Sequence, residues 1–92
     1  MVYIFLMEDV ELICKTIPEQ AEKIRELYSN DGKFQQVCQD YLEADLARKY
    51  WNNSGSENSG RYSEQYLILV SELKVEILQM IQEMTAMENW NE

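Results

Sequence analysis

Acidic side chains are the most abundant groups in this sequence that could do chemistry, and two pairs of them have helical spacing. Asp40 and Glu43 lie three residues apart and Glu72 and Glu76 lie four apart, so each pair would share one face of a helix. Paired carboxylates in a shaped pocket can transfer protons. They therefore support one alternative function, that of a small enzyme or ligand-binding protein with a carboxylate site in a helical bundle.

Other kinds of site lack the residues they need. The sequence contains no His, which excludes Ser-His-Asp and Cys-His catalysis and removes the ligands of a di-metal carboxylate bundle. Cys14 and Cys38 belong to no Cys-x-x-Cys pair, so we expect buried, reduced thiols and no zinc site. Gly55 and Gly60 form no phosphate-binding motif, and no spacing indicates a Ser-Lys pair. We therefore expect no catalytic residues, no metal and no cofactor.

The charge balance is strongly acidic, with a formal net charge of −9. Such a chain is a poor ligand for a phosphate backbone or for anionic lipid, since both require Lys and Arg. We expect neither nucleic acid nor membrane as a partner. The acidic surface serves either solubility or the recognition of a basic partner.

One region is basic. Residues 48–61 carry three basic residues and one acidic residue, beside aromatic side chains. We hypothesise that this tip docks an acidic peptide or another anion. Alternatively, the two consecutive cations balance the partial negative charge at the C-terminus of a helix, and the Trp covers the core. The residues of this candidate interaction tip are Arg48, Lys49, Trp51 and Arg61.

Helical periodicity dominates the second half of the chain. Apolar residues recur at steps of three and four over residues 62–87 and over 33–51, and the polar segment 52–61 separates these two stretches. A polar loop of this length predicts antiparallel neighbours. The expected facing pairs are apolar on both sides: Tyr50 with Tyr62, Leu46 with Tyr66, Leu42 with Leu69 and Val70, Cys38 with Leu73, and Phe34 with Ile77.

Shorter helices are expected before this hairpin. Residues 7–15 have a helical apolar face, and Pro18 predicts that another helix begins near 17 or 18. Thr16 and Glu19 match a capping box, and Asp31 after a Ser-Asn step is a suitable N-cap for the third helix. Residues 1–6 would form a disordered or packed arm, too short for a signal peptide or a membrane span. Residues 88–92 would form a frayed tail.

The longer hairpin helix should extend beyond the shorter one. The apolar residues of this overhang need a cover, which the N-terminal helices or a second copy of the chain would provide. Because methionines adapt to varied surfaces, a third option is peptide binding. The residues of this candidate dimer or partner face are Met80, Ile81, Met84 and Met87.

The middle of the chain contains a pattern of residues that is similar to a pattern in other proteins. Residues 27–41 have the form LY-x-x-D-x-x-F-x-x-x-C-x-D-Y. Together with Tyr66 and the run 72–77, this segment resembles a group of small uncharacterised bacterial proteins made of a helical hairpin. The resemblance spans residues 17–81. It implies a small cytoplasmic bacterial protein and transfers no catalytic residues.

These observations predict a single all-α domain over residues 1–92. An antiparallel hairpin, about 33–51 and 60–87, carries one or two shorter N-terminal helices packed on it. The favoured function is a non-enzymatic protein–protein interaction or regulatory module in the cytoplasm, with an unidentified protein partner or a second copy of the chain as a homodimer. An enzyme with a carboxylate site is the alternative.

Overall fold

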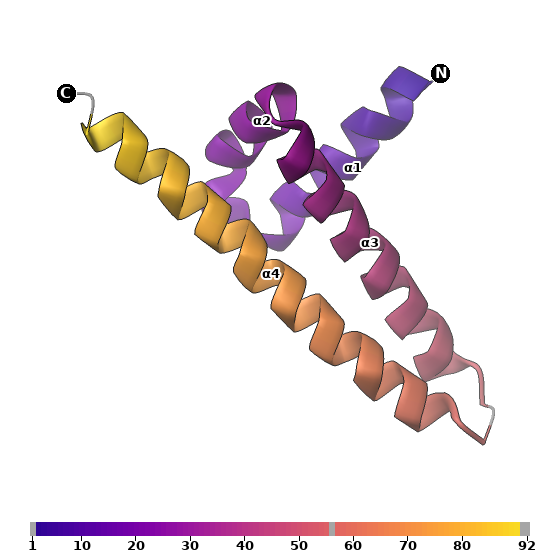
Figure 1. Ribbon diagram of the computed structural model, residues 1–92. Coiled ribbons are helices and arrows are strands. Elements are labelled where there is room, and N and C mark those ends of the chain that lie inside the picture. Colours follow the sequence, from indigo (N-terminus) through magenta and orange to yellow (C-terminus); the bar gives the residue numbers. More distant parts are fainter. Residues whose placement is uncertain (1, 56, 91–92) are drawn as a thin grey trace.

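The computed structural model describes residues 2–55 and 57–90, with the side chains of 9–55 and 57–88. The described chain is all-α, as predicted. The elements are α1 (Val2–Thr16), a short 3-10 helix η1 (Pro18–Gln20), α2 (Ala21–Asn30), α3 (Gly32–Asn53) and α4 (Ser59–Trp90), shown in Figure 1.

The two long helices, α3 and α4, form the expected antiparallel hairpin (Figure 1). Near its tip the ring of Trp51 lies against Tyr62, with 4.6 Å between the ring centroids. The expected partner of Tyr62 was Tyr50, so the rotation of α3 differs slightly from the prediction. The radius of gyration is 15.0 Å, against about 12 Å for a compact chain of this length. The hairpin therefore makes an elongated molecule.

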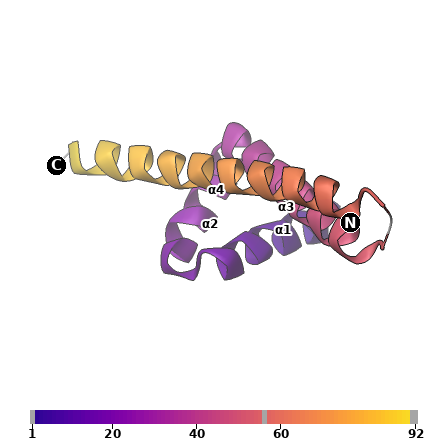
Figure 2. The same cartoon turned by 90° about the horizontal axis from the view of Figure 1, so that it is seen from below.

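The shorter helices α1 and α2 pack against each other and against α3, while α2 alone of the two also reaches α4 (Figure 2). Helix α1 begins at Val2, five residues earlier than expected, and includes most of the segment that was predicted to be an arm. The side chains of residues 2–8 lie outside the described set, as do residues 1, 91 and 92. At the other end of the chain α4 continues through Trp90, beyond the predicted start of fraying.

The break between α2 and α3 is capped as predicted. The Asp31 side chain accepts hydrogen bonds from the backbone N–H groups of Lys33, at 2.9 Å, and Phe34, at 3.2 Å. These two donors would otherwise have no partner in the first turn of α3. Asp31 therefore fixes where α3 begins and brings Phe34 into the core.

The predicted capping box at Thr16 is wrong. Thr16 is still part of α1, and its hydroxyl donates to the carbonyl of Leu12 at 3.0 Å. Ile17 takes the position before η1 and makes no side-chain cap there. Ile17 is instead 2% exposed, so burial of its side chain holds this turn.

The core consists of apolar side chains from all four helices. Its most deeply buried members are Ile13, Ile17, Ile24, Phe34, Cys38 and Ile77. Among the described residues, no polar or charged residue is buried. The predicted stripe on α3 is correct at Tyr41, which is buried, but wrong at Leu46 and Tyr50, which are 71% and 65% exposed. Ala44, which was not part of the predicted stripe, is buried in this part of α3.

Candidate interaction surface

The C-terminal part of α4 extends beyond α3, and this overhang has the most distinctive surface of the molecule. At 1.5 Å per residue, the 32 residues of α4 and the 22 of α3 span about 48 and about 33 Å. Figures 1 and 2 agree that the last turns of α4 also project past α2. Of the two shorter helices, α2 is the one that contacts α4 in the described part of the chain.

The structure divides the four residues that were predicted to form a partner face. Ile81 is 3% exposed and belongs to the core. Met80 and Met84 are half-buried, and Met80 packs against the core. Met87 is 67% exposed. Ile81 is thus part of the core. Exposure of the other three side chains is greatest at Met87.

A hollow of about 290 Å³ lies between α4 and the end of α2. We call it the overhang hollow. Leucine and methionine side chains make up its apolar part, and three carboxylates border it. The lining residues are Leu27, Asp31, Met80, Glu83, Met84, Met87 and Glu88.

One ion pair links the two sides of this region. The ammonium group of Lys23 on α2 lies 3.0 Å from the carboxylate of Glu88 on α4. Both side chains are partly exposed, so the pair contributes little to stability by itself. It does hold the end of α4 near α2, and it neutralises one of the three acids beside the overhang hollow.

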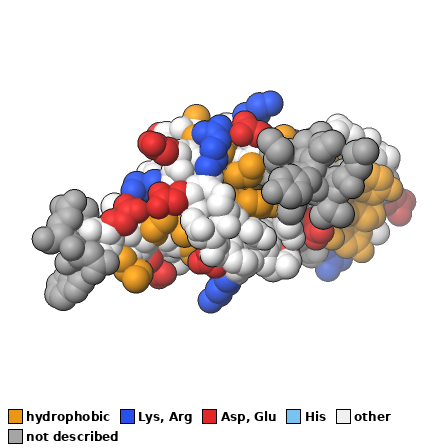
Figure 3. All heavy atoms as spheres, turned by 90° about the horizontal axis from the view of Figure 1, so that it is seen from above, with side chains coloured by type: hydrophobic (Ala, Val, Ile, Leu, Met, Phe, Trp, Pro, Cys, Tyr) orange, Lys and Arg blue, Asp and Glu red, His pale blue; other side chains and the backbone are white. Residues whose placement is uncertain are grey.

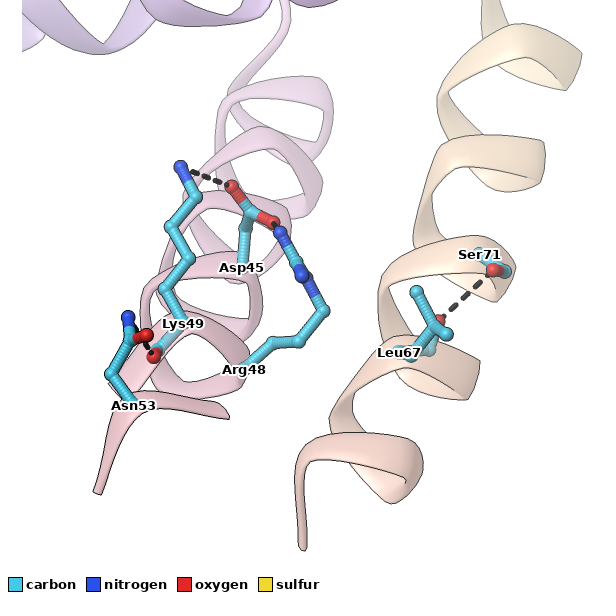
Figure 4. Close-up of polar contacts among 6 residues, drawn as sticks. All are labelled: Asp45, Arg48, Lys49, Asn53, Leu67 and Ser71. Atoms are coloured by element: carbon cyan, nitrogen blue, oxygen red, sulfur yellow. Dashed lines mark hydrogen bonds and ion pairs between the residues drawn. The ribbon is translucent and has the colours of Figure 1, made fainter. Parts of the chain in front are cut away.

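A second apolar area on α4 was missed in the sequence. Leu67, Ile68 and Val75 are 51%, 55% and 54% exposed, on the side of the helix turned away from its core stripe. Ser71 lies among them, and its hydroxyl donates to the carbonyl of Leu67 at 3.0 Å (Figure 4). The available signal was the run of four apolar residues, 67–70, which is wider than one helical face.

The basic tip is less basic in the structure than in the sequence. The guanidinium of Arg48 and the ammonium of Lys49 contact the Asp45 carboxylate at 2.9 and 3.1 Å (Figure 4). Partial burial by itself would raise the pKa of Asp45, but the hydrogen bonds and charges of these two cations outweigh it and lower that pKa. Arg61 is exposed and takes part in none of the ion pairs between described residues. The shared acid leaves less positive charge for an external anion.

Aromatic packing accounts for Trp51. Its ring meets Tyr50 edge to face, with centroids 5.2 Å apart, and lies against Tyr62 on the other helix. Such aromatic pairs stabilise by about 0.5–1.5 kcal/mol beyond the area they bury. Trp51 therefore joins α3 to α4 near the end of the hairpin by aromatic packing, while it is not among the side chains of the core.

The predicted carboxylate pairs do not meet. Asp40 and Glu43 border a second hollow, of about 380 Å³, together with Tyr66, Leu69 and Leu73. Asp40 also accepts a hydrogen bond from the amide of Gln36 at 2.9 Å. Glu72 and Glu76 are exposed and do not line this hollow. In the described part of the chain, no three His, Cys, Asp or Glu side chains are grouped as metal ligands.

Both cysteines are free and buried, as predicted. Burial raises the pKa of Cys38 to about 12 and also raises the pKa of Cys14. The Cys14 thiol lies 3.6 Å from the carbonyl of Ala21. Thiols held in their protonated form in an apolar core are poor nucleophiles, so these two side chains serve packing.

Comparison with known proteins identifies no relative. No protein-family model matches the chain, and no curated protein or solved structure matches it significantly. The resemblance to bacterial helical-hairpin proteins therefore stays a prediction from the sequence pattern. A search of the described helices for one that is long and apolar enough to cross a lipid bilayer finds none.

Proposed function

We propose that this protein is a non-enzymatic protein–protein interaction module that holds a partner against the overhang of α4. The observation that supports this most is the overhang hollow, which Met87 lines while it stays largely exposed, although Ile81 on the same part of α4 is buried. Large apolar side chains beside a polar rim are typical of protein-binding surfaces. A regulatory role would follow if the partner were itself an enzyme or a transcription factor.

The interior of the molecule supports a binding role over catalysis. The core of the described residues holds no carboxylate and no Lys or Arg, and burial raises the pKa of its thiols and phenols. Catalytic groups usually sit in a pocket that excludes water and shifts their pKa values. Carboxylates on the outer surface, such as Glu72 and Glu76, lack that setting.

Small-ligand binding is the alternative function, and one observation favours it. Asp40 and Glu43 do border a hollow of a size that could hold a small molecule. The hollow is formed by only two helices, and neither Glu72 nor Glu76 contributes to it. We therefore place this alternative second.

Self-association is a competing version of the proposed function. A second copy could cover the overhang, and short chains gain stability from association. Each copy carries a net charge of −9, so two copies would repel each other at low ionic strength. Sedimentation at low and high salt distinguishes the two versions, since a homodimer would become tighter as salt screens the repulsion.

A cytoplasmic location is part of the same proposal. The two buried thiols are unpaired, which suits a reducing compartment. A fluorescent fusion followed by fractionation of the native host would test the location independently of the binding surface.

Site-directed photo-crosslinking in the native host tests the proposed function. A photo-reactive amino acid at Met87 should capture a defined protein, whereas the same group at Leu46 should not. Leu46 is a matched control, because it is equally exposed and lies on α3 away from the overhang hollow. Capture of the same products from both positions, or of none from Met87, would refute a binding surface at the overhang.

A further inference from the structure

We propose that the overhang hollow receives the apolar side of a basic amphipathic helix from a partner protein. This inference rests on the proposed function and names the class of its partner. It combines three features of the hollow, namely its shape, its methionines and its charge.

The size of the hollow suits anchor side chains rather than a whole small molecule. Its volume, about 290 Å³, is at the lower limit of the range of about 300–1,000 Å³ for small-molecule pockets. It is bordered along α4 by Met80, Met84 and Met87, which recur at steps of four and three. Side chains at this spacing form a row along one helix, against which a second helix packs ridge into groove.

Methionine is suited to such a contact. Its side chain is unbranched and polarisable, so it can adjust to the side chains of an incoming helix. Met84 is half-buried and Met87 is 67% exposed, so both are available without opening the core. Helices that bind in apolar grooves use anchors at positions i, i+3, i+4 and i+7.

The charges beside the hollow select a basic partner. Asp31, Glu83 and Glu88 border it, and no basic side chain is among its lining residues. Lys23 neutralises Glu88 from outside, which leaves Asp31 and Glu83 without an ion pair among the described residues. Figure 3 shows acidic side chains next to hydrophobic ones at the end of the molecule that carries the C-terminus. Lys or Arg beside the apolar face of a partner helix would match this arrangement.

Charge also argues against a second copy as the occupant. Residues 62–92, which include the overhang, carry one basic and six acidic side chains. Two overhangs packed together would place these acids near one another. The basic tip of another copy is a poor substitute, because Arg48 and Lys49 are already bound to Asp45.

Synthetic helices provide the test. The first probe is a peptide of about 18 residues, or about five turns, made of Leu and Lys with Leu at i, i+3, i+4 and i+7. A second peptide replaces every Lys by Glu, and a third has the composition of the first in a scrambled order. The full-length protein, labelled with ¹³C at its methionine methyl groups, is titrated with each peptide and observed by NMR.

Only the ordered Leu/Lys peptide should shift the methyl signals of Met84 and Met87 at low peptide concentration. Because the contact depends partly on charge, its affinity should fall as salt rises. The double variant Met87→Gln, Glu83→Gln should weaken binding by about tenfold, which is typical for the loss of a hot-spot contact. Leu46→Gln is the matched control and should bind as the wild type does.

The inference is overturned if the Leu/Glu peptide binds equally well. It is also overturned if the Leu/Lys peptide binds while the signals of Met84 and Met87 stay unmoved, since the peptide then adheres to acids elsewhere. In either case, a persistent photo-crosslink from Met87 in cells would keep the interaction module and reject only the partner class. Failure of the peptides and of the crosslink together rejects both proposals.

Discussion

The clearest quantitative prediction compares two residues of the overhang that the sequence pattern treats alike. Ile81 is 3% exposed and Met87 is 67% exposed. Truncation of a buried Ile to Ala typically costs about 2–5 kcal/mol, because the lost apolar contacts leave a cavity. Truncation of an exposed side chain usually changes stability by less than about 0.5 kcal/mol. We therefore expect Ile81→Ala to destabilise the fold strongly and Met87→Ala to leave it almost unchanged.

Urea denaturation, followed by circular dichroism, measures both effects. A chain of this length has a free energy of unfolding of about 5–14 kcal/mol, so a loss of about 3 kcal/mol is a large fraction of it. With a slope of about 1.5 kcal/mol per molar urea, the midpoint for Ile81→Ala should fall by about 2 M. Equal shifts for the two variants would mean that Met87 is also covered in solution, and the overhang would then not be a binding surface.

Three further predictions concern single side chains. Asp31→Ala should lower the unfolding free energy by about 1 kcal/mol, because two N–H groups of α3 lose their acceptor, and denaturation beside Asp31→Ser, which should keep most of the cap, checks it. Although burial opposes them, the ion pairs hold the pKa of Asp45 below its ordinary value of 3.8. Their stabilisation is therefore present above that pH and is lost as pH falls through the folded-state pKa, so melting curves of wild type and Asp45→Asn should converge in acid and not in base. Burial raises the pKa of Cys38 from 9.0 to about 12, so its contribution to stability is constant below pH 9 and falls as pH rises between these values. Alkylation followed by mass spectrometry should modify Cys38 only as fast as the protein unfolds, and rapid labelling of the native protein would contradict its burial.

Features that depend on neighbouring residues in the chain were predictable from the sequence. Asp31 follows a helix-breaking segment and lies two and three residues before the N–H groups it binds, so a local pattern was sufficient. The hairpin was also predictable, because a single polar loop joins two long helices. Cys38 lies among apolar residues, and its burial followed from that setting.

The rotation of α3 was not predictable from its own sequence. Leu46 and Tyr50 fit the predicted apolar stripe as well as Tyr41 does, yet only Tyr41 is buried, together with Ala44, which the stripe did not include. Helices α1, α2 and α4 all pack on α3, so its rotation depends on contacts with three other helices. A small residue such as Ala44 also lets a neighbouring helix approach closely, which a pattern of apolar residues does not reveal.

The capping box predicted at Thr16 shows that residues can have the right types and spacing for a motif without forming it. Thr16 and Glu19 have the spacing of a capping box. Thr16 remains inside α1, however, where its hydroxyl has the carbonyl of Leu12 within reach. Bonding back to the preceding turn is common for Thr within helices. The pattern therefore marked the region where α1 ends and the next helix begins, but it assigned the wrong role to the Thr16 hydroxyl, which donates to a carbonyl instead of accepting from a backbone N–H.

The division of the overhang follows from helix geometry and from the length of α2. Successive residues of a helix are rotated by about 100°, so Met87, six positions after Ile81, points about 120° away from it. One neighbouring helix cannot cover both directions. Helix α2 has 10 residues, or about 15 Å, and its buried Ile24 and Tyr28 are committed to the core. A helix of this length cannot cover both the side of α4 that carries Ile81 and the side that carries Met87, and Met87 stays 67% exposed.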